Sequence, residues 1–158
     1  MSVTSFRVAN FLKMVSMFMV LGSLVYFYAY VEDRLGFMTN SQDWFVAATK
    51  SAIFYSGLGI FAVFNLIMGL SINLYMNAQG YDKNSWLFKS ELQKEVIRFW
   101  LIYLTASINF LITCFILYIA MIKINGMTSN TDFVFLPIAG MVAMLISVIG
   151  LLVAFAKK

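Results

Sequence analysis

The sequence predicts an all-α integral membrane protein with four transmembrane helices, on three observations. Hydrophobic residues make up 62% of the 158 residues and charged residues only 11%, whereas soluble domains carry roughly 25% charged residues. The apolar residues fall into four blocks, each long enough to cross a hydrocarbon core that takes about 20 residues. The basic residues flank these blocks instead of forming one face, so the net charge of +4 indicates membrane topology and not a nucleic-acid partner.

The first block covers about residues 12–31. Arg7 and Lys13 stand before the apolar run, as in a signal peptide, but the run ends in the bulky segment 26–31, which makes a poor cleavage site. We therefore expect a retained helix. Lys13 would lie near its start, where a lysine stem reaches the headgroups, and we expect no charge near the middle of any block.

The second block, at about 46–74, carries a stripe of small and polar residues at helical spacing. Small residues let helix backbones approach closely, and polar residues hydrogen-bond between helices. We therefore expect this stripe to pack tightly. Its members are Ala48, Ala52, Ser56, Gly59, Ala62, Asn65, Gly69 and Asn73.

A loop at about 77–95 leads to the third block, at about 98–122. Ser90 and Gln93 match a capping box with Ser90 as the N-cap, which predicts that the third helix begins at Glu91, before the bilayer.

The fourth block, at about 136–156, repeats the small-residue pattern. Pro137 stands where it can begin this helix or kink its first turns. From both patterns we expect the second and fourth helices to be the tightly packed ones. The members of the fourth-block stripe are Gly140, Ala143, Ser147, Gly150 and Ala154.

The distribution of Lys and Arg predicts that both termini are cytoplasmic. Eight of the eleven lie in the N-terminus, the middle loop with its flanks, and the C-terminus, and three lie in the other two loops. The positive-inside rule puts the richer side in the cytoplasm. No Asn-x-Ser/Thr sequon occurs, which fits a bacterial inner (plasma) membrane.

The two outer loops resemble each other, which predicts an internal duplication. Residues 38–44 are mirrored by residues 127–133, and residues 52–59 share with residues 143–150 the pattern Ala, three bulky residues, Ser, two residues, Gly. Two helices per repeat preserve orientation, so the hairpins would be related by an axis along the membrane normal. The repeats would cover about 10–76 and 97–158.

Four polar residues invite a functional and a structural interpretation. Asn65 and Asn109 lie well inside their blocks and would form either a polar pathway or an interhelical hydrogen bond that fixes register. Asp43 and Asp132 would bind a cation or, as we favour, cap the first turn of the helix that follows each of them.

The composition excludes several chemistries. Histidine is absent, which excludes His-ligated haem and His-dependent triads. Cys114 is the single cysteine, so no intramolecular disulfide is possible, and we interpret it as a buried apolar residue. Methionine could bind Cu(I), but without supporting Cys or His we interpret it as packing or lipid-facing. We expect no cofactor, no metal and no catalytic site.

The function expected from these observations is that of a non-enzymatic subunit with a structural, assembly or stabilising role in a larger inner-membrane complex. Its partners would be the lipid bilayer and other membrane subunits or further copies of itself. The alternative is a small oligomeric transporter or channel with a neutral polar pathway near Asn65 and Asn109. A third reading, an enzyme acting on lipid, would depend on the cluster Glu32, Asp33 and Arg34.

Overall fold

The structure, a computed structural model, describes residues 3–31, 34–35, 48–77, 91–124 and 133–156. Four helices within these ranges are long and apolar enough to cross a membrane, which confirms the predicted all-α membrane fold. With 22 residues the last helix is roughly 33 Å long, about the thickness of a hydrocarbon core. The helices are α1 (Val3–Tyr30), α2 (Lys50–Asn77), α3 (Glu91–Ile124) and α4 (Phe135–Ala156).

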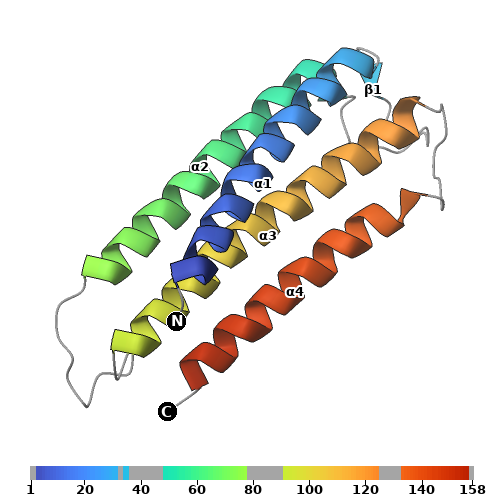
Figure 1. The fold of residues 1–158 in the computed structure, drawn as a ribbon. Coiled ribbons are helices and arrows are strands. Elements are labelled where there is room, and N and C mark those ends of the chain that lie inside the picture. The colour runs from blue at the N-terminus through green and yellow to red at the C-terminus, as the bar shows by residue number, and fades with distance from the viewer. Residues whose placement is uncertain (1–2, 32–33, 36–47, 78–90, 125–132, 157–158) are drawn as a thin grey trace, which may run out of the picture.

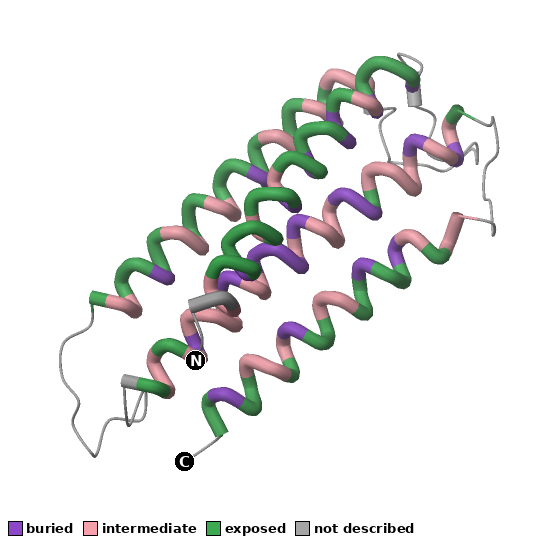
Figure 2. Tube along the Cα trace, viewed as in Figure 1, coloured by how far each residue is buried: buried purple, intermediate pink, exposed green. Residues whose placement is uncertain are grey.

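The helices lie side by side, and α3 lies between α1 and α4 (Figure 1). α1 and α3 run in one direction and α2 and α4 in the other, so the described ends of the chain meet at one end of the bundle, here called the terminal end. The closest packing joins α3 to α1 and to α4, whereas α2 packs less extensively against α1 and α3. Figure 2 shows the result: buried residues concentrate on α3, and α2 has few of them.

The prominence of α3 differs from the sequence expectation, which gave the tightest packing to the second and fourth helices. α4 does pack closely, but α2 is the least buried of the four. The reason is that α3 carries buried side chains on two sides and so contacts α1 and α4 at once.

Two helix starts also differ from the expectation. α1 begins at Val3 and not near residue 12, because Phe6 and Ala9 already pack against α2 and α3 and extend the helix toward the terminus. α2 begins at Lys50, because the strand β2 (Ala48–Thr49) pairs antiparallel with β1 (Arg34–Leu35). α3 begins at Glu91, where the capping pattern placed its start, although Ser90 itself lies outside the described residues.

The core between α1, α2 and α3 is a series of apolar layers along the bundle axis. The layer nearest the terminal end contains Ala9, Ile72 and Ile102. The next apolar layer contains Val20, Leu24 and Phe61, and the farthest contains Phe27, Val31 and Ala120. Along α1 and α2 the first two layers are separated by a polar level, which is described below.

Aromatic rings pack where α1 and α3 meet at the terminal end. Phe6 meets Phe99 edge to face with centroids 6.5 Å apart, and Trp100 packs edge to face with Phe99 and Tyr103. Trp and Tyr are enriched at membrane interfaces, and Trp100 and Tyr103 are the side chains of these two types in this cluster.

Candidate functional site

The centre of the bundle holds a pair of asparagine side chains that face each other from α2 and α3. Asn65 Nδ2 donates to Asn109 Oδ1 at 3.0 Å, and Asn109 Nδ2 donates to Asn65 Oδ1 at 3.0 Å. The two amides thus form a closed reciprocal pair. The structure therefore brings together the two asparagines that the sequence singled out.

A serine of α1 joins this pair and links three helices. Asn109 Nδ2 donates its second proton toward Ser16 Oγ at 3.4 Å, and the Ser16 hydroxyl donates to the Lys13 carbonyl at 2.7 Å. Asn65 Nδ2 donates its second proton to the Phe61 carbonyl at 2.9 Å. Ser16, Asn65 and Asn109 are called here the central polar cluster.

Every donor of the central polar cluster has an acceptor inside the bundle. An asparagine side chain has two N–H donors, and both amides use both of theirs. A solute could therefore receive a hydrogen bond from this cluster only if an existing one broke. Asn109 is fully buried, so breaking its bonds would leave a polar group without a partner in an apolar interior.

The neighbouring hydroxyls of α3 bond to their own helix. Thr105 donates to the Leu101 carbonyl, Ser107 to the Tyr103 carbonyl and Thr113 to the Asn109 carbonyl, each within 3.0 Å. Such bonds satisfy a hydroxyl within its helix and leave the helix surface effectively apolar.

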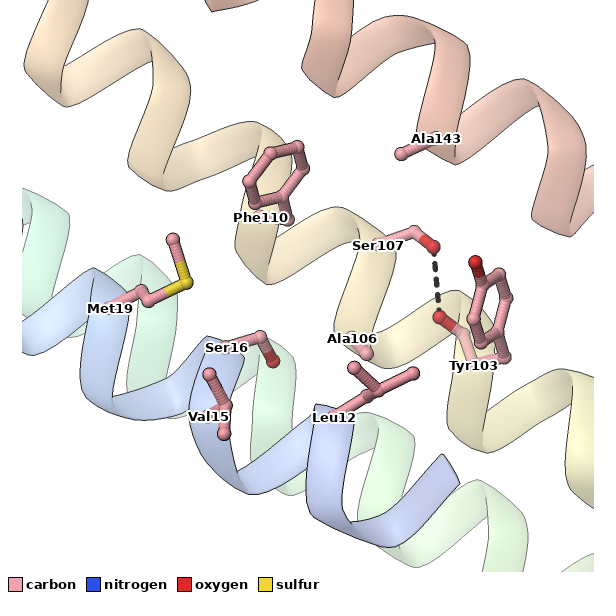
Figure 3. A pocket seen from close by; sticks show the side chains of 9 residues that line it. All are labelled: Leu12, Val15, Ser16, Met19, Tyr103, Ala106, Ser107, Phe110 and Ala143. Carbon is pink, nitrogen blue, oxygen red and sulfur yellow. Dashed lines mark hydrogen bonds between the residues drawn. The ribbon is translucent and has the colours of Figure 1, made fainter. Parts of the chain in front are cut away.

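A groove of about 270 Å³ opens between α1 and α4, with α3 as its floor. Figure 3 shows Leu12, Val15 and Met19 of α1 on one wall and Ala143 of α4 on the other. Its two serine hydroxyls, Ser16 and Ser107, already donate to backbone carbonyls. The groove accordingly presents a mainly hydrocarbon surface beside the central polar cluster.

Lys13 lies farther along its helix than the sequence expectation placed it. Because α1 begins at Val3, Lys13 is the eleventh of its 28 residues and not a residue at the helix start. It follows Ala9 by four residues and precedes Ser16 by three, so it shares the face of α1 that carries these two buried residues. An ammonium group therefore projects from the inward side of a membrane-spanning helix, one turn from the central polar cluster.

The stripe on α2 divides into an inward and an outward part. Asn65 belongs to the central polar cluster, but Ala52, Ser56 and Gly59 are exposed. A Cβ added at Gly59 or at Gly69 would meet no atom within 4 Å among the described residues. No described residue packs on the outward part of this stripe, because α2 turns other residues toward α1 and α3.

The corresponding stripe on α4 is covered by α3. A Cβ added at Gly140 would lie 2.9 Å from the Leu111 Cα atom, and one at Gly150 would overlap the Trp100 ring. Ser147 is fully buried and donates to the Met144 carbonyl at 2.7 Å, whereas Ala143 lines the groove. The small residues of the α4 stripe thus lie against α3, whereas Ala52, Ser56 and Gly59 of the α2 stripe are exposed.

The structure does not describe the three predicted capping residues, and it adds one serine that the sequence reasoning did not name. Asp43, Asp132 and Ser90 lie outside the described residues. Ser16 was not singled out, although the buried positions Ala9, Ser16 and Val20 repeat at helical spacing and would have located it on the inward face of α1.

Comparison with protein-family models, curated proteins and solved structures finds no match to this chain. The candidate function therefore depends on the geometry described above.

Proposed function

We propose that this chain is a non-enzymatic integral membrane subunit that stabilises or helps to assemble a larger membrane complex, and that α2 is the helix its partner contacts. The observation that carries the proposal is the small-residue face of α2 at Ser56 and Gly59, which is exposed and which no described residue covers.

The difference between the α2 and α4 stripes supports a partner helix that packs on α2. Residues 52–59 and 143–150 share one pattern, and on α4 the glycine of that pattern, Gly150, lies against Trp100 of α3. Between helices in lipid, association depends on close packing and hydrogen bonds, which small residues permit. The equivalent face of α2 has no cover among the described residues, and a helix of another subunit or copy would supply it.

We further infer the finer placement of the chain from its sequence. The excess of Lys and Arg at the terminal end favours a cytoplasmic location for that end, and the lack of sequons fits a bacterial inner membrane. The shared pattern favours two duplicated hairpins, of which one has retained a neighbour and the other has exposed its stripe.

The central polar cluster supports a structural role more than the alternative of a polar pathway. Asn65 and Asn109 use all their donors on each other, Ser16 and a carbonyl. Transport along this route would predict solute flux in liposomes that Asn65→Leu abolishes while the fold persists.

The test compares two leucine substitutions at glycines that have open space. Gly59→Leu adds a side chain to the proposed interface on α2, and Gly22→Leu adds the same side chain to exposed α1. Both variants should fold as isolated chains. After mild extraction from the native membrane, native mass should reveal a stoichiometric complex for the wild type and Gly22→Leu, and a free chain for Gly59→Leu.

Equal complex formation by both variants would remove the α2 face from the proposal. A wild-type chain that is recovered alone would contradict the accessory role itself, and a homo-oligomer lost in Gly59→Leu would identify the partner as a second copy.

A further inference from the structure

We propose that the partner on α2 is a second copy of this chain, and that two parallel α2 helices pack against each other across a two-fold axis. This inference rests on the proposed function, because it names the occupant of the same face.

The outward face of α2 carries exposed residues at alternating steps of three and four. This seven-residue repeat keeps one face of a helix against a second helix over several turns. Transmembrane helices that pack in this way cross at about +20°. The seam, as this set is called here, consists of Ser56, Gly59, Val63, Leu66, Leu70 and Asn73.

The seam lies on the side of α2 that faces away from α1 and α3. Phe61 and Ile72 are buried and belong to the apolar layers between the three helices. Each is two residues from a seam position, which corresponds to about 200° around the helix axis. A second helix can therefore pack along the seam without displacing either layer.

The residue types near the start of the seam favour a helix as its cover. The Ser56 hydroxyl donates to the Ile53 carbonyl at 3.1 Å, so it is satisfied within its own helix. A Cβ added at Gly59 would meet no atom within 4 Å among the described residues. A face that meets acyl chains alone needs no small side chains, whereas two helix backbones approach closely only where side chains are small.

Asn73 provides the argument for a second copy. Its amide is exposed between Leu70 and Leu74, which are 53% and 72% exposed, and it forms no side-chain hydrogen bond among the described residues. In a parallel two-fold pair each residue on the axis meets its own equivalent. An amide has both donors and acceptors, so two Asn73 side chains can pair reciprocally, as Asn65 and Asn109 do within the chain.

The charges of α2 permit this symmetric contact. A parallel pair of identical helices brings like charges together, which costs free energy, but residues 51–77 contain no charged side chain. The Lys50 ammonium, at the start of α2, lies over the Tyr28 ring of α1, 5.1 Å from its centroid. It is thus directed toward α1 and away from the seam, so two copies can meet along the seam without repulsion.

Disulfide crosslinking in intact native membranes tests the seam position by position. Leu66→Cys and Ile67→Cys are compared in the full chain after Cys114→Ala has removed the native thiol. Leu66 and Ile67 are 63% and 54% exposed but lie about 100° apart around the helix. Gly59→Cys and Ile60→Cys form a second matched pair of exposed neighbours. After oxidation, the products are identified by mass.

We expect the two seam variants, Leu66→Cys and Gly59→Cys, to give a product of twice the mass of the chain. Ile67→Cys and Ile60→Cys should give several-fold less of it. The reason is geometric: a disulfide requires two Cβ atoms within about 4.5 Å of each other, and in the proposed pair the seam positions alone meet this condition.

Asn73→Leu, added to the Leu66→Cys chain, should weaken the pairing about threefold, the effect of losing one average interhelical hydrogen bond in a membrane. Ser71→Leu is the matched control, because Ser71 is also polar and exposed but lies off the seam. It should leave the crosslinked fraction unchanged. Equal effects of the two substitutions would contradict the pairing of the Asn73 side chains.

Equal yields of the doubled mass from Leu66→Cys and Ile67→Cys would overturn the inference, because copies would then collide without a defined face. Its absence from both seam variants would overturn the inference as well. A photoreactive residue at Leu66 then separates the two claims. An adduct with a different protein would assign α2 to another subunit and keep the proposed function, whereas lipid adducts alone would contradict both.

Discussion

At the scale of single residues, the bundle is organised by polar side chains that satisfy one another. The sequence alone indicates that Asn65 and Asn109 lie inside the membrane, because each is surrounded by apolar residues. It cannot indicate that they meet, because the relative height of two helices depends on packing between them and not on spacing within either. Ser16 was overlooked for a related reason: a serine in such a helix usually bonds to its own backbone, and Ser16 does so while also accepting from Asn109.

The reciprocal pair predicts coupled effects of substitution. Asn109→Leu removes a fully buried partner and should lower the free energy of unfolding by about 0.6–1.7 kcal/mol, the range measured for interhelical hydrogen bonds in membranes. Asn65→Leu should cost somewhat less because Asn65 is half-buried. The double variant leaves neither amide without its partner, so its loss of unfolding free energy should be smaller than the sum of the losses in the two single variants. Reversible unfolding in detergent measures the free energy of unfolding of the wild type and the three variants. Strictly additive losses would contradict direct pairing.

At the scale of elements, composition identifies helix faces but not what covers them. Residues 52–59 of α2 and 143–150 of α4 have Ala, Ser and Gly at the same spacing, so the sequence gives no reason to distinguish these two segments. Only the structure distinguishes them, because Trp100 and Leu111 of α3 occupy the space over α4. The start of α1 shows the same limit: the apolar run begins after Lys13, yet Phe6 and Ala9 extend the helix toward the terminal end by packing on α2 and α3.

The two stripes should respond oppositely to a single methyl group. Gly140→Ala brings a Cβ to 2.9 Å from the Leu111 backbone, and overpacking of this kind costs about 1–3 kcal/mol. Gly59→Ala adds its methyl group to open space and should stabilise the isolated chain by about 0.5–1 kcal/mol through helix propensity. Unfolding midpoints of the two purified variants check the contrast, and equal destabilisation by both would show that α2 is covered within the chain.

Cys114 gives an independent measure of α3–α4 packing. The Cys114 side chain is almost fully buried. A Cβ added at Gly140 would lie 3.4 Å from the Cys114 Cβ atom. Alkylation of the folded wild type should therefore be slow and limited by opening of the helix pair. Gly140→Ala should accelerate it several-fold, whereas Gly59→Ala should not. Rapid labelling of the wild type would contradict the close packing of α3 and α4.

At the scale of the whole molecule, the sequence predicted four apolar helices correctly because span length and hydropathy depend on the bilayer and not on tertiary contacts. The arrangement around α3 could not be predicted, since lipid tails and leucine side chains are equally apolar and provide no signal for which faces meet. The outcome is an asymmetric bundle in which α1 and α4 each pack closely against α3, while α2 presents a small-residue face that no described residue covers. That asymmetry is the basis of the proposed role as a subunit.

The most direct test of this role is photo-crosslinking in intact native membranes, before any detergent is added. A photoreactive residue at Ser56, on the exposed face of α2, is compared with one at Gly22, on exposed α1. We expect the Ser56 probe to give one protein adduct of defined mass and the Gly22 probe to give lipid adducts alone. Lipid adducts alone from both positions would contradict the account, because the face of α2 would then be covered by the bilayer and by no partner.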